Sequence, residues 1–540
     1  MEQQQEQSFA PRAAMSWSGW IATAVLALAF LIAITILTRE QNGGPPHTDV
    51  DLAGNEPATI YMPGTPGALY ASVPLSPKPV AERPPGVVVV HGYTADRVVM
   101  GRLARRFALN GYVALAIDLH GHGENRNPFE SNFLGNDTLI DDIKAAVDFL
   151  RGSGLVDPSR IVVLGHSMGA GAALDYAMRD TKLSGAVMIS GGFDLFGPAR
   201  PRNALFIFGE HDPSFLRTLS LALVSQLAGT GQPELGKLYG DFDKGDAVEA
   251  FEVPGANHLE ILVVDSAARK VIEWADSATG VHRTGEIKLA DPRRATSGIA
   301  LLLFLVLMIP LGRIVGAFAP GWTRAASSRD GWIGLAWLAV ALIVAMPISM
   351  SVPASVLSLD NANEVFSWLG IAGVLLMIAI ALREPLELRR TVSGSARTLG
   401  AALLGFAIIY AITLPISVTL HRLTFTPERF AMALLATVIV LPFWLGFELL
   451  IRRGSLTMST LASIAGRVLL LVLLFAGIGL SALPTVLGLI GALFVLMFIA
   501  YEIFAASVYS TSANLAAIAL VESAWTAWIL CAWMPIRFSF

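Results

Sequence analysis

Long apolar runs dominate the second half of the sequence and constrain its fold more than any other feature. Each run approaches the roughly 20 apolar residues that a helix needs to cross the hydrocarbon core of a bilayer. Eight runs follow residue 296, near Ser297–Phe318, Gly331–Val352, Val365–Leu382, Leu399–Leu420, Phe430–Ile451, Ile464–Leu483, Thr485–Ala506 and Leu515–Trp533. The whole chain is 54% hydrophobic and 15% charged, which is typical of a protein that lies largely in lipid. We therefore expect residues 297–540 to form an all-α, multi-pass domain of about eight helices in the lipid bilayer.

A ninth apolar run, Trp17–Leu37, lies near the N-terminus. It contains no charged residue, it is longer than the apolar part of an ordinary signal peptide, and no A-x-A-like cleavage site follows it. We interpret residues 17–38 as an uncleaved transmembrane signal anchor that follows a tail of residues 1–16. A cleavable signal peptide is the alternative interpretation.

The distribution of arginines predicts the orientation of the chain in the cell membrane. With the N-terminus inside, the inner loops carry Arg313, Arg324, Arg329, Arg383, Arg389, Arg390, Arg397, Arg452 and Arg453, and the outer loops carry only Arg422 and Arg429. Basic residues are enriched in cytoplasmic loops. The part of the chain between the first and second apolar runs is therefore expected on the extracytoplasmic face.

That intervening part has the pattern of a soluble α/β domain. Short β-branched runs alternate with helical segments, which predicts a mostly parallel sheet with helices on both faces. The expected strands and their exits are Gly86–Gly92, Tyr112–Gly121, Arg160–Ser167, Gly185–Gly192, Ala204–Asp212 and Ala250–His258, with a leading antiparallel hairpin at Thr59–Leu75. We expect the domain at residues 58–278, between linkers at residues 39–57 and 279–296.

The pentapeptide "GHSMG" has the form G-x-S-x-G, with Ser167 at its centre and His166 and Met168 beside it. It follows the apolar run "RIVVL" and precedes the helical pattern "AGAALDYAM". A serine in such a sharp strand-to-helix turn needs small neighbours, here Gly165 and Gly169, because larger side chains would collide with the backbone. The pattern predicts a nucleophile elbow; the alternative is that Ser167 is only a helix N-cap.

A serine nucleophile requires a base and an acid that orients the base, in the chain order serine, acid, histidine. His258 follows the last expected strand and is the candidate base. Asp212 is the candidate acid, and Asp194, which leaves the preceding strand, is the alternative. Parallel strands bring these loops to one edge of the sheet.

An oxyanion would need backbone N–H donors, which we expect from Met168 and from Tyr93 in "HGYTADR", with His91 bracing that loop. We expect no metal and no other cofactor, because histidines such as His120 and His122 lie in glycine turns without a matching carboxylate and cysteine set. The formal net charge of −4 gives no basic excess, so nucleic acid is not an expected partner.

The segments "HGYTAD", "AIDLHGHGEN", "GHSMGAG", "GEHDP" and "GANH", in this order, resemble the α/β-hydrolases, nearest to their esterase, lipase and dienelactone-hydrolase-like branches. The resemblance covers roughly Thr59–Ser277. It implies a Ser167, Asp212 and His258 triad, an oxyanion hole at Tyr93 and Met168, and an ester or lipid-like substrate. A peptidase or acyltransferase with the same triad, or a transporter or assembly protein with a non-catalytic domain, are the alternatives.

Few charged residues lie deep in the apolar runs. Glu522 falls near the middle of its run, whereas Glu448, Arg467 and Glu502 fall close enough to expected helix ends for their charges to reach the interface. We expect Glu522 to accept a hydrogen bond from a neighbouring helix, such as the one that bears Asn514 or Ser512.

Overall fold

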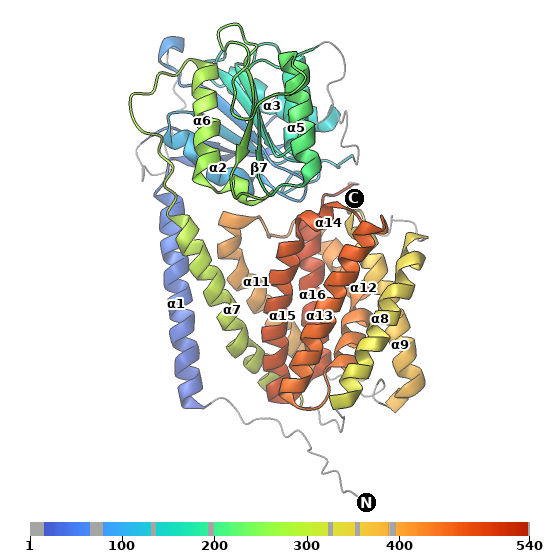
Figure 1. Cartoon of the computed structure of the whole chain (residues 1–540). Helices are drawn as coiled ribbons and strands as arrows, with labels where there is room; N and C mark the ends of the chain where they lie inside the picture. Colours follow the sequence, from blue (N-terminus) through green and yellow to red (C-terminus); the bar gives the residue numbers. More distant parts are fainter. Residues whose placement is uncertain are drawn as a thin grey trace, which may run out of the picture. The chain divides into compact units, whose positions relative to one another are not determined.

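The computed structural model describes residues 16–64, 79–130, 137–192, 199–321, 328–351, 357–386, 388 and 396–537. The chain forms two compact units (Figure 1). The helical unit comprises residues 1–35, 296–416 and 423–532, and the sheet unit comprises residues 36–295, 417–422 and 533–540.

The sheet unit contains one eight-stranded sheet in the order β1-β2-β4-β3-β5-β6-β7-β8. Its strands are β1 His47–Asp51, β2 Pro57–Tyr61, β3 Gly86–Val90, β4 Val113–Ile117, β5 Ile161–His166, β6 Gly185–Ile189, β7 Ala204–Gly209 and β8 Val248–Val253. β1 and β2 are antiparallel to each other, β2 is antiparallel to β4, and the remaining neighbours are parallel. The carboxyl ends of β3 to β8 therefore lie along one edge of the sheet.

Helices cover both faces of this sheet. They are α2 Arg97–Leu109, α3 Asp137–Gly152, α4 Met168–Arg179, α5 Ser214–Ala228 and α6 Asp265–Thr279, with short 3-10 helices at η2 Val80–Glu82 and η3 Glu260–Leu262. Phe107 of α2 and Trp274 of α6 share one apolar core with Val87 and Val89 of β3. The alternate residue Val88 is also fully buried, and because successive strand side chains point to opposite faces, the other face is covered too.

All six strands expected from the β-branched runs are present, but the predicted leading hairpin is wrong. β2 includes Thr59, yet its two edges are paired with β1, in the segment expected to be a linker, and with β4, so neither edge is left for a hairpin partner. Residues 65–78 lie outside the described residues. β1 has the sequence "HTDVD", which is short and largely polar, so it carries no apolar alternation that would have revealed a strand.

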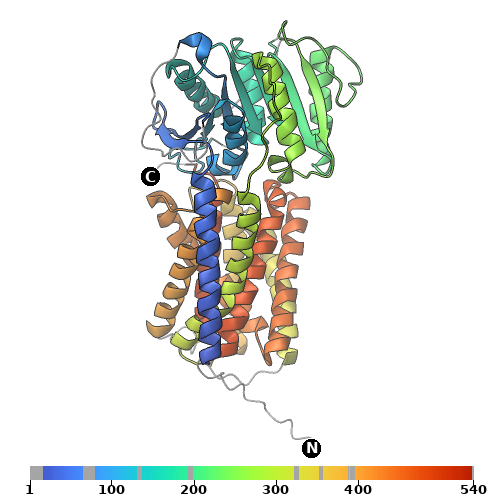
Figure 2. The same ribbon diagram turned by 90° about the vertical axis from the view of Figure 1, so that its left-hand side faces the viewer.

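The helical unit is built from long apolar helices (Figure 2). Their bounds are α1 Trp17–Asn42, α7 Arg293–Phe318, α8 Ser328–Met350, α9 Ala362–Arg383, α11 Ala396–Leu420, α12 Pro427–Ile451, α13 Leu456–Gly479, α15 Gly491–Ser512 and α16 Leu515–Trp533, with the single turn α14 Val486–Leu489. In the described part of the chain these nine long helices are each long and apolar enough to cross a membrane. This is compatible with a multi-pass membrane protein.

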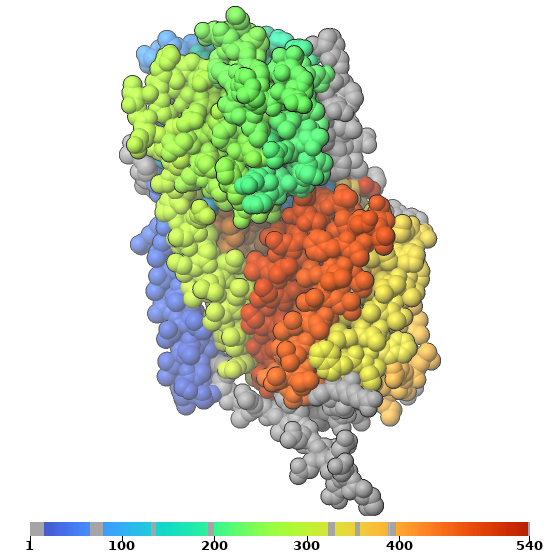
Figure 3. Space-filling view, in the orientation of Figure 1, coloured from blue at the N-terminus to red at the C-terminus, as the bar shows by residue number. Residues whose placement is uncertain are grey.

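One side of α13 carries exposed apolar side chains. Val468, Val472 and Phe475 are 52%, 57% and 46% exposed, and their spacing places them on one helix face. The orange α13 lies on the face seen in Figure 3. Contiguous exposed apolar side chains of this kind suit contact with lipid tails.

Each predicted apolar run falls on one long helix, but two sets of bounds differ. α13 begins at Leu456 rather than Ile464, and α15 spans Gly491–Ser512 rather than Thr485–Ala506. The chain leaves the helix at Ser481, whose φ is 56°, and Pro484 follows, which has no amide hydrogen for a helix interior. The segment around Ser481 and Pro484 therefore separates α13 from α15.

Candidate functional site

Ser167 occupies the sharp turn that the sequence predicts. β5 ends at His166 and α4 begins at Met168, and Ser167 between them has φ 53° and ψ −117°. A Cβ added to Gly165 would lie 2.0 Å from the carbonyl oxygen of Gly169, and one added to Gly169 would lie 2.3 Å from that of His91. Both glycines are thus sterically required. The Ser167 side chain makes no capping hydrogen bond to α4, so the interpretation of Ser167 as only an N-cap is wrong.

The structure brings Ser167, His258 and Asp212 into a hydrogen-bonded series. Nε2 of His258 lies 3.1 Å from Oγ of Ser167, and Nδ1 of His258 lies 2.8 Å from Oδ1 of Asp212. The three residues follow β5, β8 and β7, at the shared edge where these parallel strands end. A serine, an imidazole and a carboxylate in this order have the geometry for proton transfer from the hydroxyl to the ring.

Asp212 is buried and held by three donors. Besides His258, the hydroxyl of Ser190 donates to Oδ2 at 2.6 Å and the N–H of Gly209 donates to Oδ2 at 2.7 Å. Burial alone would raise the pKa of Asp212, but these hydrogen bonds to its charged form keep the pKa below its ordinary value. Asp212 is thus a carboxylate aimed at His258. Asp194, the alternative acid, lies outside the described residues.

The loop after β3 approaches Ser167 closely. A Cβ added to Gly92 would lie 3.1 Å from Cβ of Ser167, so the backbone that leads into Tyr93 lies beside the serine. Nε2 of His91 accepts the N–H of Leu119 at 3.0 Å, and its Nδ1 lies 2.7 Å from the carbonyl oxygen of Gly92, which confirms its bracing role. The loop and the start of α4, at Met168, thus offer backbone on two sides of the hydroxyl.

The sequence did not indicate two supporting contacts around this site. Ser190, which orients Asp212, follows β6 directly. Its position at the edge where the parallel strands end could have indicated that it lies near Asp212. Nε2 of His166 lies 3.0 Å from the carbonyl oxygen of His258, and the two rings are 4.8 Å apart. Burial, together with the nearby ring of His258, lowers the pKa of His166 to about 3, so His166 remains a neutral donor.

His166 should make the protein sensitive to acid. Its pKa is about 3 when folded and 6.5 in an unperturbed chain, so its contribution to stability is complete above pH 6.5 and decreases as the pH falls towards 3. We expect the wild-type protein to lose about 2 kcal/mol more unfolding free energy between pH 7 and 5 than His166→Gln, whose amide keeps the donor. Denaturant unfolding at both pH values measures this. The exposed His211→Gln is the control, and an equal loss in all three proteins would contradict the prediction.

The helical unit contains a buried group of charges, which we call the ion cluster. It comprises Glu448 of α12, Arg452 directly after that helix, Ser463 and Arg467 of α13, Glu502 of α15 and Glu522 of α16. Arg452 bonds Glu448 at 2.6 Å and Glu502 at 2.8 Å, and Arg467 bonds Glu522 at 2.6 Å and Glu502 at 3.2 Å. All five charged residues are at most 7% exposed.

The ion cluster corrects several expectations. Glu448, Arg467 and Glu502 are buried in the ion cluster and do not extend to solvent, and the earlier start of α13 places Arg467 well inside that helix. Glu522 pairs with Arg467 rather than with Asn514 or Ser512, since Asn514 donates to Pro320 and Thr398. Three expected loop residues are also buried: Arg452 in the ion cluster, Arg453, which bonds Glu384, and Arg429, which donates to the carbonyl of Cys531.

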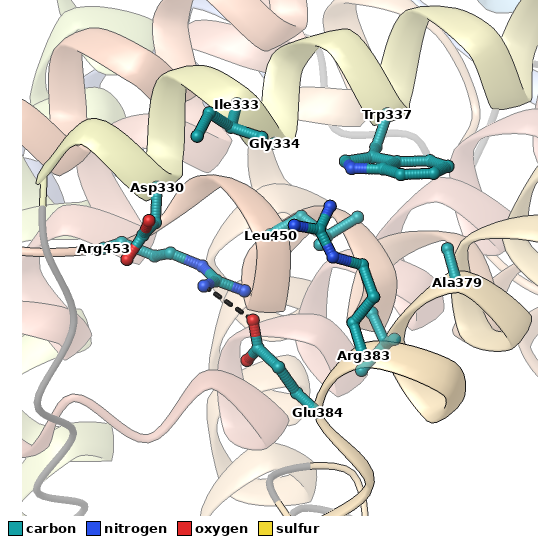
Figure 4. A pocket seen from close by; sticks show the side chains of 10 residues that line it. Asp330, Ile333, Gly334, Trp337, Ala379, Arg383, Glu384, Leu450 and Arg453 are labelled. Carbon is teal, nitrogen blue, oxygen red and sulfur yellow. Dashed lines mark hydrogen bonds and ion pairs between the residues drawn. The ribbon is translucent and has the colours of Figure 1, made fainter.

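A small pocket of about 120 Å³ lies between α8, α9 and the end of α12 (Figure 4). Arg453 bonds Glu384 at 2.9 Å, and the guanidinium of Arg383 lies 5.3 Å from the centre of the Trp337 ring. Asp330 also lines the pocket. Two basic and two acidic side chains balance there, so the lining favours neither an anion nor a cation.

Comparisons with known proteins gave a family match within the sheet unit and several similar proteins. Residues 82–225 match the family model described as serine aminopeptidase, S33. The quorum-quenching protein AidA of Acinetobacter baumannii is 30% identical over 104 residues, which are 19% of this chain and 34% of that protein. A bis(hydroxyethyl) terephthalate hydrolase of Streptomyces coelicolor is 32% identical over 108 residues, 19% of this chain and 32% of that protein. The chain thus spans about a third of the length of these curated relatives.

Among solved structures, an esterase from Pyrobaculum calidifontis is similar, with 16% identity and a TM-score of 0.31, over 48% of this chain and 92% of that one. The mostly parallel sheet with helices on both faces has the α/β-hydrolase fold, and the family match falls within it. The chain thus combines a sheet unit that matches the S33 family model over residues 82–225 with a helical unit whose long apolar helices are compatible with multiple membrane spans.

Proposed function

We propose that this protein is a membrane-embedded serine hydrolase that cleaves carboxylic esters, including lipid-like esters, on the extracytoplasmic face. The observation that supports it most is the hydrogen-bonded series of Ser167, His258 and Asp212, with distances of 3.1 and 2.8 Å. Because nothing in a purely binding domain would require these three groups in line, the series favours catalysis over a non-catalytic role in transport or assembly.

In the proposed mechanism His258 takes the proton of the Ser167 hydroxyl as its oxygen attacks the ester carbonyl carbon. The backbone N–H groups of Met168 and Tyr93 donate to the oxyanion that forms. The C–O bond to the alcohol then breaks, and His258 gives its proton to the departing oxygen. Water, deprotonated by His258, attacks the acyl-enzyme, the acid product leaves, and the proton returns to Ser167. Asp212 holds His258 in the required tautomer throughout.

That the substrate is an ester is a more specific proposal than that the protein catalyses hydrolysis. One matched relative is named for hydrolysis of an aromatic diester, whereas the family model is described as an aminopeptidase. A peptidase with the same triad is therefore the second candidate. A panel of short-chain and long-chain acyl esters and matched amides separates the two, and added alcohol acceptors reveal acyl transfer. Faster turnover of amides than of matched esters would contradict the proposed substrate class.

Labelling of intact cells with a membrane-impermeant fluorophosphonate probe tests chemistry and sidedness together. We expect the probe to modify the protein at Ser167, as located by peptide mass spectrometry, with no labelling of Ser167→Ala. A permeant probe and opened cells provide the comparison for sidedness. Labelling only after the cells are opened would contradict the extracytoplasmic face, and labelling of neither preparation would contradict the serine hydrolase.

A further inference from the structure

Glu56, His120 and Asp142 converge in the sheet unit, and the proposed hydrolysis uses none of them. Glu56 directly precedes β2, His120 follows β4, and Asp142 lies in α3. One possible ligand atom from each residue lies within 4.8 Å of the other two. Glu56 and Asp142 are 7% and 1% exposed, and the side chain of His120 is 16% exposed. The three residues thus form a mostly buried group with limited access from solvent.

The group holds two carboxylates and a single side chain, His120, that can carry a positive charge. Oε2 of Glu56 is buried and no N–H or O–H donor among the described residues bonds it, while the Glu56 carboxyl lies close enough to that of Asp142 for the two to share a proton. The largest electrostatic influences on Glu56 come from Asp142, His120 and Asp141, of which only the histidine ring can become positive. Buried carboxylates are ordinarily paired or coordinate a metal, because an isolated buried charge is costly. The unpartnered oxygen therefore points to an additional cation.

We propose that Glu56, His120 and Asp142 bind one divalent transition-metal ion, with Zn²⁺ as the best match. Two carboxylates and a neutral imidazole carry a net charge of −2, which a divalent ion neutralises. Mixed oxygen and imidazole donors suit Zn²⁺, whereas Mg²⁺ and Ca²⁺ prefer oxygen donors alone. Three protein ligands leave a fourth position for water, on the side where His120 is partly exposed.

The donors are already held near one another. Nδ1 of His120 lies 2.6 Å from Oδ1 of Asp142, and the backbone N–H of His120 donates to Oδ2 of Asp142 at 2.8 Å. The backbone bond would keep the Asp142 carboxylate in place after the ion enters. The proton between the ring and the carboxylate would leave to solvent as the metal binds, since ligands must be deprotonated.

The ion would fasten three segments that are far apart in the sequence. It would join the β1–β2 turn and α3 to the loop after β4, which continues to His122. The ring of His122 packs edge-on against Tyr93, with centroids 5.7 Å apart. We therefore expect metal binding to stabilise the sheet unit and to support the Tyr93 loop, without a part in the bond-breaking steps.

The test uses the full-length protein in detergent, purified with a tag that contains no histidine and then stripped with a chelator. We expect the wild-type protein to bind one Zn²⁺ per chain by elemental analysis. At a free Zn²⁺ concentration 100 times Kd, its Tm should rise by roughly 5 to 10 °C, and chelator should reverse the rise. Mg²⁺ at the same concentration should give no rise.

Glu56→Gln removes one charge and one ligand but keeps the shape of the side chain, and we expect it to weaken Zn²⁺ binding by about 100-fold or more. The matched control is Asp141→Asn, which removes the same charge from an exposed residue next to Asp142 and should bind Zn²⁺ nearly as the wild type does. Equal affinity in Glu56→Gln and Asp141→Asn would overturn the proposal, as would wild-type protein without stoichiometric Zn²⁺ or an equal stabilisation by Mg²⁺. A preserved Tm of metal-free Glu56→Gln shows that the variant folds.

Discussion

Replacement of Ser167 by alanine should lower kcat/KM for ester hydrolysis by about 10⁵-fold or more, because the attacking oxygen is lost while the fold remains. His258→Ala should cause a similar loss, since the serine then has no base at the 3.1 Å position. The two residues act as one unit, so the double variant should be no worse than either single variant.

Ester hydrolysis by the three purified variants measures these losses. Ser277→Ala is the control, because Ser277 is exposed and its hydroxyl bonds only the Glu273 carbonyl of its own helix at 3.1 Å. Thermal unfolding of each variant separates a chemical loss from misfolding. A well-folded Ser167→Ala protein with near wild-type turnover would rule out the proposed nucleophile.

Asp212→Asn should reduce kcat by about 10⁴-fold with little change in the fold. Oδ1 of Asp212 accepts the hydrogen of Nδ1 of His258, which leaves Nε2 free to take the serine proton. The asparagine amide can instead donate to Nδ1, and this favours the tautomer whose Nε2 already carries hydrogen. The steady-state kcat of the purified variant measures the loss.

Asp194→Asn is the companion variant, since Asp194 is the other acid that the sequence offers, and we expect it to retain activity. An inactive Asp194→Asn together with an active Asp212→Asn would reverse the assignment of the acid. The kcat of Ser190→Ala should lie between those of Asp212→Asn and Asp194→Asn. Ser190→Ala removes one of three hydrogen bonds to Asp212 and leaves the other two.

The strands and the elbow could be predicted because their signals are local. The run "GVVVV" is buried throughout as β3, and the glycines around Ser167 are required by contacts within the same turn. The chain order of serine, acid and histidine then indicated Asp212 and His258. β1 could not be found in this way, since its pairing with β2, and not its own residues, makes it a strand.

Side-chain groups whose members come from distant segments could not be predicted from the sequence. Hydropathy indicates where a helix runs but not which neighbour its charged residue will face, so the pairing of Arg467 with Glu522 was missed. The same limit explains why the sequence did not indicate the two carboxylates that the structure places near His120. Its nearest carboxylates, Glu56 and Asp142, come from a turn and a helix that only the folded sheet brings to it.

The ion cluster has a consequence for how the chain is made. A single charged side chain at the centre of a span costs about 2.5 to 3.5 kcal/mol on insertion. Synthesis delivers Arg467 on α13 before Glu522 on α16, so the arginine gains that carboxylate only after α16 has been made. If these helices span the bilayer as we propose, α13 and α16 would therefore mature together rather than one by one, and a nascent chain interrupted before Leu515 would hold an arginine without one of its counter-ions.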